Sequence, residues 1–380
     1  MSAPAPAAAV RVRVDVLSER ESIGSLSGEW ERLRADVSAA GGTRGPFLAP
    51  AWFAAYAAEL PAGALRLLIA RGDGQLRAVL PLMFERRAVA GIHARVLRSL
   101  SDDHSQRFDL LMKRGDNEAA RALLAALSSD PSWDVLEMRD APVEGSAVDT
   151  LLEAANRAGF PSGHWSAMSS PALSLPSSRA DLYSRLNPRF CANLRRRRRR
   201  LEQEVGPIAL ERVRNAGGRM ALERALDDAF RLEAAGWKGA SGTAIAADWR
   251  LVQRYRRIAH AFAEQGALAL AFLTVGGHRK AFHFALLEQG VYYLFKPGYD
   301  PALARYGPGH LLVQEVVEDL IEHGAHELDF LGDCDAWKRE WTGDVRRHAW
   351  RYVFAPTPFG RALAWLKLRL APRLKRVVRR

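Results

Sequence analysis

The sequence predicts a mixed α/β (α+β) fold for this chain of 380 residues. Short alternating or apolar stretches typical of strands recur along it, and longer stretches with the apolar spacing of helices lie between them. The stretch Val291–Leu331 contains a strand, a glycine turn, a helix and a second strand, which indicate a β-α-β unit. The length exceeds that of a typical single domain, so we expect two or three domains.

The composition is that of a globular protein, with 48% hydrophobic and 26% charged residues. No apolar run reaches the roughly 18–20 residues that span a bilayer, and the first residues do not resemble a secretory signal. The cysteines, Cys191 and Cys334, are too few to form a zinc site alone, so no metal site is predicted. They favour a reducing compartment, and we expect a cytoplasmic protein.

The first half alternates strands and helices. Residues 1–10 are rich in Ala and Pro and are expected to form a disordered leader, followed by an N-terminal half at 11–175. The predicted strands are Arg11–Leu17, Leu65–Ala70, Gln75–Phe84, Ala94–Ser99, Phe108–Met112 and Val135–Met138. The predicted helices are Ile23–Ala35, Ala51–Tyr56, Asn117–Leu127 and Ser146–Ala158.

The second half, expected at 176–356, continues in the same style and contains a β-meander before the β-α-β unit. Its predicted helices are Arg179–Glu204, Met220–Ala235 and Ala247–Gln265. Its predicted strands are Ile208–Val213, Leu268–Val275, Lys280–Glu288, Val291–Phe295, Glu327–Leu331 and Arg346–Phe354.

The tail, 357–380, is basic and amphipathic. From Pro358 to Arg380 there are eight Lys or Arg and no acid, so most of the net charge of +12 lies there and the body is only mildly basic. That distribution argues against a nucleic-acid-binding protein with a broad basic face. Leu363, Trp365, Leu366 and Leu370 are interleaved with the cations, which favours peripheral contact with an anionic membrane. The alternative is a basic extension that docks on the body.

Gly307-Pro308-Gly309 begins the helix of the β-α-β unit. Proline suits the first helical position, and the amides of Gly309 and His310 are at the positive end of the helix dipole. Such a helix start fits a pyrophosphate, although any glycine-capped helix start offers the same groups.

Several short motifs together resemble a known family. They are Asn193-Leu194-Arg195, Trp237-Lys238-Gly239, Phe282–Leu287, Gly298-Tyr299-Asp300, Gly307–Leu312, Asp329, Gly332-Asp333, Lys338 and Trp341, with Trp30, Phe47, Trp52 and Pro81-Leu82 in the first half. Their order resembles the acyl-CoA N-acyltransferase (GNAT) superfamily, in the branch linked to cellulose and exopolysaccharide biosynthesis and related to the FemAB peptidoglycan aminoacyltransferases. The resemblance covers about residues 12–355. It implies two GNAT-like halves, with the acyltransferase site in the second.

The resemblance implies an enzyme that transfers an acyl group, expected to be acetyl, from acyl-CoA to an amino group of a sugar or of a polysaccharide or envelope precursor. One alternative is a FemAB-like transferase that uses aminoacyl-tRNA. Another is a degenerate, non-catalytic GNAT scaffold in polysaccharide secretion. One departure keeps these alternatives open. The family loop has Gln or Arg where this chain has Ala304, and Arg305 comes one place late.

The resemblance also implies donor contacts. Gly307 and the amides of Gly309, His310 and Leu311 would bind the pyrophosphate. A backbone N–H on the bent strand at Leu294, Phe295 and Lys296 (Leu294–Lys296) would polarise the thioester carbonyl, a contribution of roughly 3–4 kcal/mol per donor.

The general base is predicted among several polar side chains. Asp329 is the first candidate because it matches the family's Asp after the loop helix; a strand-end carboxylate capping a neighbouring loop is about as good an interpretation. His283 is the second catalytic candidate, although its apolar strand favours a core histidine. Asp300, Asp333 and His310 are further candidates, since a GNAT base often acts through water.

The acceptor side is predicted from aromatic residues beside cations, which suit a sugar or phosphosugar. The predicted substrate-binding residues are Trp237, Lys238, Tyr299, Asp333, Lys338 and Trp341. The alternative for these residues is a core tryptophan beside a solvated lysine.

Six consecutive arginines, Arg195–Arg200, lie on the first long helix of the second half. They fit a solvated helix partly neutralised by Glu202 and Glu204. They also fit a contact for an anionic lipid-linked phosphosugar or, under the tRNA alternative, for RNA.

Overall fold

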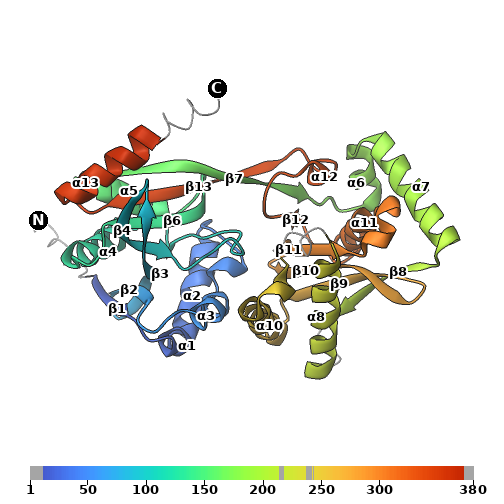
Figure 1. The fold of residues 1–380 in the computed structure, drawn as a ribbon, viewed down its shortest axis with the longest axis horizontal. Helices are drawn as coiled ribbons and strands as arrows, with labels where there is room; N and C mark the ends of the chain where they lie inside the picture. The colour runs from blue at the N-terminus through green and yellow to red at the C-terminus, as the bar shows by residue number, and fades with distance from the viewer. Residues whose placement is uncertain (1–11, 214–217, 237–241, 243, 372–380) are drawn as a thin grey trace, which may run out of the picture. The chain divides into compact units, whose positions relative to one another are not determined.

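The computed structural model describes residues 12–213, 218–236, 242 and 244–371, which fold into two compact units (Figure 1). Unit 1 is the chain up to Ala167 together with the chain from Arg347 onward, and unit 2 is Met168–Arg346. The borders expected from the sequence, after residues 175 and 356, therefore differ from the observed ones. The strand expected at the end of the second half belongs largely to unit 1.

Unit 1 is built on the strand order β1-β2-β3-β4-β6-β13. Its strands are β1 (Arg13–Leu17), β2 (Leu65–Gly72), β3 (Gln75–Val89), β4 (Ile92–Ser99), β5 (Leu111–Met112, paired with β3), β6 (Val135–Pro142) and β13 (Val345–Phe354). Its helices are α1 (Glu21–Ser25), α2 (Ser27–Ala39), α3 (Pro50–Ala57), α4 (Asn117–Ser129), α5 (Val148–Arg157) and α13 (Pro358–Trp365). In this strand order, β4 and β6 pair in parallel, and each of the other neighbouring pairs is antiparallel.

Unit 2 has the order β8-β9-β10-β11-β12-β7. Its strands are β8 (Ile208–Val213), β9 (Leu268–Val275), β10 (His278–Glu288), β11 (Val291–Tyr299), β12 (Glu327–Asp329) and the second half of β7 (Ser162–Ser174). Its helices are α6 (Arg179–Arg185), α7 (Pro188–Glu204), α8 (Gly218–Ala235), α10 (Trp249–Glu264), α11 (Pro308–Glu322) and α12 (Ala336–Arg339). The fourth and fifth strands again form the parallel pair, so the strand directions match those of unit 1. The chain order differs at the sixth strand, because β13 follows the other strands of unit 1 and β7 precedes the other strands of unit 2.

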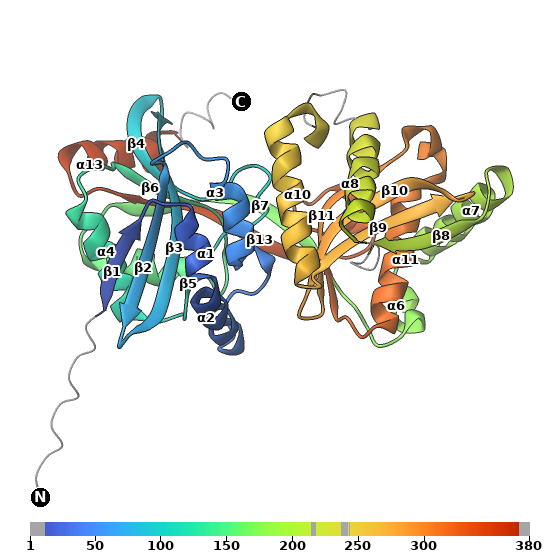
Figure 2. The same ribbon diagram turned by 90° about the horizontal axis from the view of Figure 1, so that it is seen from below.

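Helices cover both faces of the unit 2 sheet (Figure 2). On one face Tyr255 of α10 packs edge-on against Phe284 of β10, with ring centroids 5.4 Å apart. On the other face α7 and α11 pack over Ala281, Ala285 and the buried Tyr292. β10 therefore presents Phe284 to one layer and Ala281 and Ala285 to the other.

Two predicted helices are interrupted in the structure. The helix expected at Arg179–Glu204 is α6 and α7, because Asn187 is extended before Pro188 and its side chain caps α7 by accepting a hydrogen bond from the Arg189 N–H at 2.9 Å. The helix expected at Ile23–Ala35 is likewise divided into α1 and α2. β7 was not predicted, because its serine-rich sequence lacks an alternating apolar pattern.

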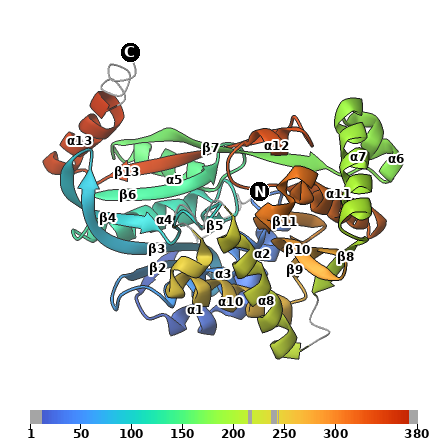
Figure 3. The same ribbon diagram turned by 45° about the vertical axis from the view of Figure 1, so that its right-hand side comes forward.

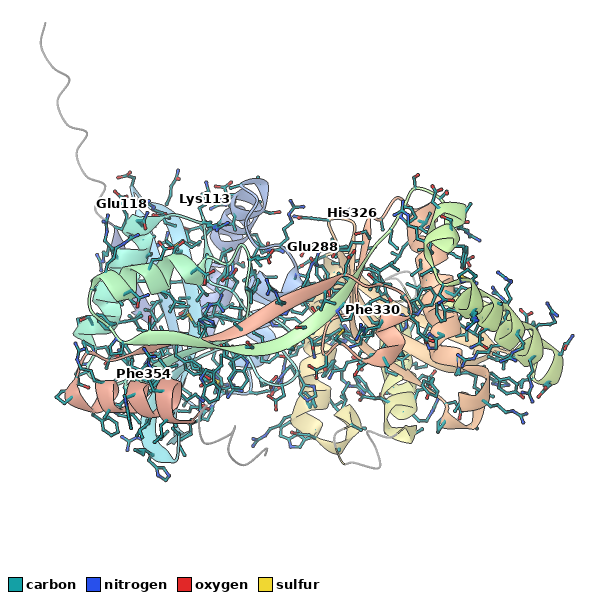
Figure 4. The ribbon with its side chains drawn as sticks, turned by 90° about the horizontal axis from the view of Figure 1, so that it is seen from above. Lys113, Glu118, Glu288, His326, Phe330 and Phe354 are labelled. Carbon is teal, nitrogen blue, oxygen red and sulfur yellow. The ribbon has the colours of Figure 1, made fainter. Side chains whose placement is uncertain are left out.

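The first part of the tail docks on unit 1. Leu363 of α13 is fully buried in a cluster with Tyr352 and Phe354 (Phe354 is labelled in Figure 4). Leu368, in the next turn, lies against Gly163 so closely that a β-carbon there would be 2.7 Å from it. Leu363 of the expected apolar face thus packs on the protein, as in the docking alternative, whereas Trp365 is exposed.

No helix among the described residues is long and apolar enough to cross a membrane.

Candidate active site

β11 bends and separates from β12 at its middle. In the pairing of β10 with β11, Ala285 is opposite Leu294 and the preceding Phe284 is opposite Lys296. Phe295 therefore has no partner on β10 and forms a bulge. On the other edge, the pairing with β12 ends at Tyr293 and Asp329, while β11 continues to Tyr299. The bend lies at the segment Leu294–Lys296 that was predicted to polarise a carbonyl.

α11 begins at Gly307, whose φ of 62° is in the left-handed region that favours glycine. The carbonyl of Gly307 accepts hydrogen bonds from the N–H groups of His310 (3.1 Å) and Leu311 (3.2 Å). These two predicted donors are therefore engaged within the first turn. The Gly309 N–H remains at the positive end of the helix dipole, and the Tyr299 ring lies against Gly309.

A cation from α7 lies over this helix start (Figure 3 shows α7 beside α11). A β-carbon on Gly307 would be 2.8 Å from a guanidinium nitrogen of Arg197. Among the described residues no carboxylate pairs with Arg197, which is half-buried. Arg305 instead pairs with Glu204 at 3.1 Å and covers the ring of Tyr306. Arg197 therefore brings positive charge to a loop in which Ala304 supplies none.

Other arginines of α7 have structural partners. Arg198 pairs with Glu315 of α11, and Arg200 pairs with Glu204 at 2.6 Å. Arg195 and Arg199 are exposed. The helix is thus partly neutralised, as one interpretation of the arginine run expected, and Arg197 is the member that reaches the glycine turn.

Asp329, the first candidate for the general base, is fully buried. Its carboxylate accepts a hydrogen bond from the Leu331 N–H at 2.9 Å and pairs with Arg346 at 2.7 Å. A carboxylate so enclosed does not reach an acceptor amine. The structure supports the alternative interpretation, a carboxylate that caps the loop after β12.

His283 is also buried, with 1% of its surface exposed, and its Nδ1 lies 3.4 Å from the Tyr292 hydroxyl. Burial lowers the pKa of His283 to about 3, so the ring is neutral at physiological pH. It is a core histidine, as its apolar strand suggested, and its catalytic assignment is not supported.

Lys338 has a structural role as well. Its buried ammonium donates to the carbonyls of Leu331 (2.9 Å) and Asp333 (2.7 Å) and pairs with Asp335 at 3.0 Å. These three contacts use its three donors. The predicted acceptor contact of Lys338 is therefore not supported, whereas the carboxylate of Asp333 is on an exposed residue.

Trp341 is buried, and its indole N–H donates to Nδ1 of His310 at 3.2 Å. The other ring nitrogen of His310, Nε2, lies 3.1 Å from the carboxylate of Glu340. Phe190 packs edge-on against both rings, and Trp337 packs against His310 and Phe330 (Phe330 is labelled in Figure 4). Trp341 thus orients a histidine and offers no open platform for a sugar. Trp237 and Lys238 lie outside the described residues.

Burial, with the nearby guanidinium of Arg197, lowers the pKa of His310 to about 4. The neutral ring then carries its proton on Nε2, the nitrogen that faces Glu340, because Nδ1 accepts the hydrogen bond from Trp341. The sequence pointed to His310 and to the arginine run as a whole, but not to Glu340 or to the place of Arg197 at the glycine turn. Arg197 and Glu340 lie 113 and 30 positions from His310 along the chain, so no local pattern signals these contacts.

The segment that builds this site matches a known domain. Residues 188–339 match the family model described as an acetyltransferase (GNAT) domain. The match begins at α7 and ends at α12, and so contains the bent strand and the glycine turn. The chain therefore carries a GNAT-type N-acyltransferase domain.

Solved structures share the fold at low sequence identity. A structure described as FemX is 12% identical with a TM-score of 0.50, over 79% of this chain and 90% of that one. L-PGS from Bacillus licheniformis is 13% identical with a TM-score of 0.52, over 92% and 95%. A conserved protein of unknown function from Bacteroides thetaiotaomicron is 13% identical with a TM-score of 0.52, over 90% and 99%. No curated protein matches the chain. The domain match and these folds confirm the predicted α/β fold of the GNAT class.

Proposed function

We propose that this protein transfers an acyl group, expected to be acetyl, from acyl-CoA to an amino group of a sugar or of a polysaccharide or envelope precursor in the cytoplasm. The observation that carries the proposal is the GNAT domain at residues 188–339, in which a bent strand is followed by a glycine-capped helix. The acceptor class comes from the resemblance to the exopolysaccharide-associated branch.

The donor pyrophosphate would bind at the start of α11. The Gly309 N–H, the positive end of the helix dipole and the Arg197 guanidinium over Gly307 are suited to its negative charge. A main-chain N–H within Leu294–Lys296 would stabilise the oxyanion that forms when the amine attacks the thioester, and the exposed Tyr299 would lie beside the donor.

The tail could add a membrane contact through two exposed aromatic residues, of which Trp365 was expected from the sequence and Phe359 was not. Phe359 and Trp365 are exposed (43% and 57%) on α13, which also carries the exposed Arg361. Aromatic residues with cations suit an anionic lipid surface. Replacing Phe359 and Trp365 by serine should then lower co-sedimentation with anionic vesicles. Unchanged co-sedimentation would contradict this contact.

Calorimetry with acetyl-CoA and with longer acyl-CoAs tests the proposed donor. A β-carbon on Gly309 would meet only ordinary contacts, the nearest being Tyr299 at 3.5 Å, so a side chain can be added there. Gly309→Glu places a negative charge against the pyrophosphate and should weaken binding at least tenfold, about 1.4 kcal/mol. Gly309→Gln, of the same size without the charge, is the matched control and should lose much less.

Absence of binding by every acyl-CoA would overturn the proposed donor. It would leave the aminoacyl-tRNA transferase and the scaffold as the remaining interpretations of the fold.

A further inference from the structure

Unit 2 contains a cavity of about 410 Å³ whose lining comes from the start of α7 and the end of α12. The lining residues are Asn187, Arg189, Phe190, Asn193, Arg339 and Glu340. None of the residues predicted from the sequence to bind substrate lines it.

Glu340 lies beside a buried histidine at this cavity. Its carboxylate is 3.1 Å from Nε2 of His310, and His310 accepts a hydrogen bond from Trp341 on its other ring nitrogen. Because the buried His310 is neutral, its closeness does not cancel the negative charge of the carboxylate. Glu340 is 47% exposed, so its negative charge remains accessible.

Two guanidinium groups line the same cavity. Arg189 and Arg339 are exposed, and no carboxylate among the described residues pairs with either. Planar guanidinium groups bind phosphate and carboxylate through paired hydrogen bonds. The cavity thus offers one exposed carboxylate and two cations that pair with no described carboxylate, which is complementary to a ligand that carries both an ammonium and an anionic group.

The cavity is connected to the donor region through one residue. His310, behind Glu340, directly follows Gly309 on α11, so the helix that begins at the proposed pyrophosphate site also supports the cavity wall. Phe190 contributes an apolar surface, since its ring packs edge-on against His310 at 5.5 Å between centroids.

We propose that this cavity is the acceptor subsite, and that the acceptor is a primary amine that also carries a phosphate or a carboxylate. Glu340 receives the ammonium, and Arg189 and Arg339 receive the anionic group. His310 is a positioning residue that acts through Glu340. The assignment as an acceptor subsite rests on the proposed acyltransferase function, whereas the ligand chemistry rests on the cavity itself.

Calorimetric binding to the full-length protein in the absence of CoA tests the ligand chemistry. The probes are glucosamine, which has the amine alone, glucosamine 6-phosphate, which adds a phosphate, and muramic acid, which adds a carboxylate. Glucose 6-phosphate, which lacks the amine, completes the set. We expect the two probes with both groups to bind at least tenfold more tightly than either single-group sugar, and the tighter of the two identifies the anionic group.

Variants assign the contacts. Arg189→Ala and Arg339→Ala should bring the affinity for the anionic amino sugars down toward that of glucosamine. Glu340→Gln should weaken all three amines and leave glucose 6-phosphate unchanged. Arg195→Ala, an exposed arginine on α7 outside the cavity, is the matched control and should change nothing. In a transfer assay His310→Gln should raise KM for the amine more than it lowers kcat, with acyl-CoA affinity retained.

The outcomes separate the two proposals. If acyl-CoA binds but the amino sugars bind equally with or without an anionic group, or the three cavity variants behave like Arg195→Ala, the cavity proposal is overturned and the acyltransferase remains. If no acyl-CoA binds but the amino sugars bind as expected, the ligand chemistry stands and the assignment as an acceptor subsite is overturned.

Discussion

At the scale of single residues, Leu331 is in a left-handed conformation (φ 50°) that a bulky residue rarely adopts. Asp329 accepts from its N–H and Lys338 donates to its carbonyl, each at 2.9 Å. Such conformations persist where the surroundings determine them, and they are common near functional sites. Asp329 and Lys338 therefore shape the turn that leads to Glu340.

Asp329→Ala should destabilise the protein. The change leaves the Leu331 N–H without its acceptor and removes one of the two carboxylates that pair with Arg346, the other being Glu327. Because Arg346 is partly exposed and keeps Glu327, we expect about 2–3 kcal/mol, below the usual loss for breaking a buried pair. Denaturant unfolding measures it, with Asp333→Asn as the exposed control. A large loss of transfer rate with unchanged stability would instead restore Asp329 as the general base.

His283 should make stability depend on pH. Its folded pKa of about 3 lies below the ordinary value of 6.5, so between these values the unfolded state binds the proton and stability falls as pH is lowered. The loss is up to about 1.4 kcal/mol per pH unit below 6.5. Between pH 7 and 5, the unfolding free energy of His283→Gln should change by about 2 kcal/mol less than that of the natural sequence. Equal pH dependence would contradict a buried neutral histidine.

At the scale of elements, α13 is part of the core of unit 1. Its apolar residues pack on Val89 and Tyr352, and Lys367 in the next turn lies 3.8 Å from the centre of the Trp165 ring. An amphipathic helix presents one apolar face, and here most of that face is covered by the protein itself.

Leu363→Ala should therefore destabilise unit 1 by about 2–5 kcal/mol, because it removes fully buried methyl groups. Thermal unfolding measures the loss, and Leu366→Ala, at a partly exposed position, should cost clearly less. Equal effects of the two substitutions would show that α13 does not dock as described.

At the scale of the whole molecule, the two units have matching strand directions, and the sixth strand of each belongs partly to the other unit along the chain. β7 begins in unit 1 and ends in unit 2, whereas β13 begins in unit 2 and ends in unit 1. In unit 1, β13 pairs with β6 and buries Tyr352, Val353 and Phe354. Unit 1 is thus discontinuous in sequence, whereas unit 2 is one continuous segment.

Residues 168–346 expressed alone should fold, because they contain all the strands of unit 2 from the middle of β7 onward. Residues 1–167 should not fold alone, since the edge of β6 and its apolar face would be exposed. Adding 347–380 as a second chain should restore the fold, as measured by circular dichroism and amide dispersion. A stable 1–167 fragment would contradict this division.

The amino-acid sequence by itself determined most elements of this protein, because helices and strands are encoded by contacts between residues two to four positions apart. The apolar face of α11, the glycine turn at Gly307 and the β-meander before that turn were all predictable from the sequence, and so was the GNAT class. The tertiary structure alone decided which partner each element meets. It placed β13 in unit 1, paired Asp329 with Arg346, laid Arg197 over Gly307 and joined His310 to Glu340. These contacts join residues far apart along the chain, so no local pattern encodes them.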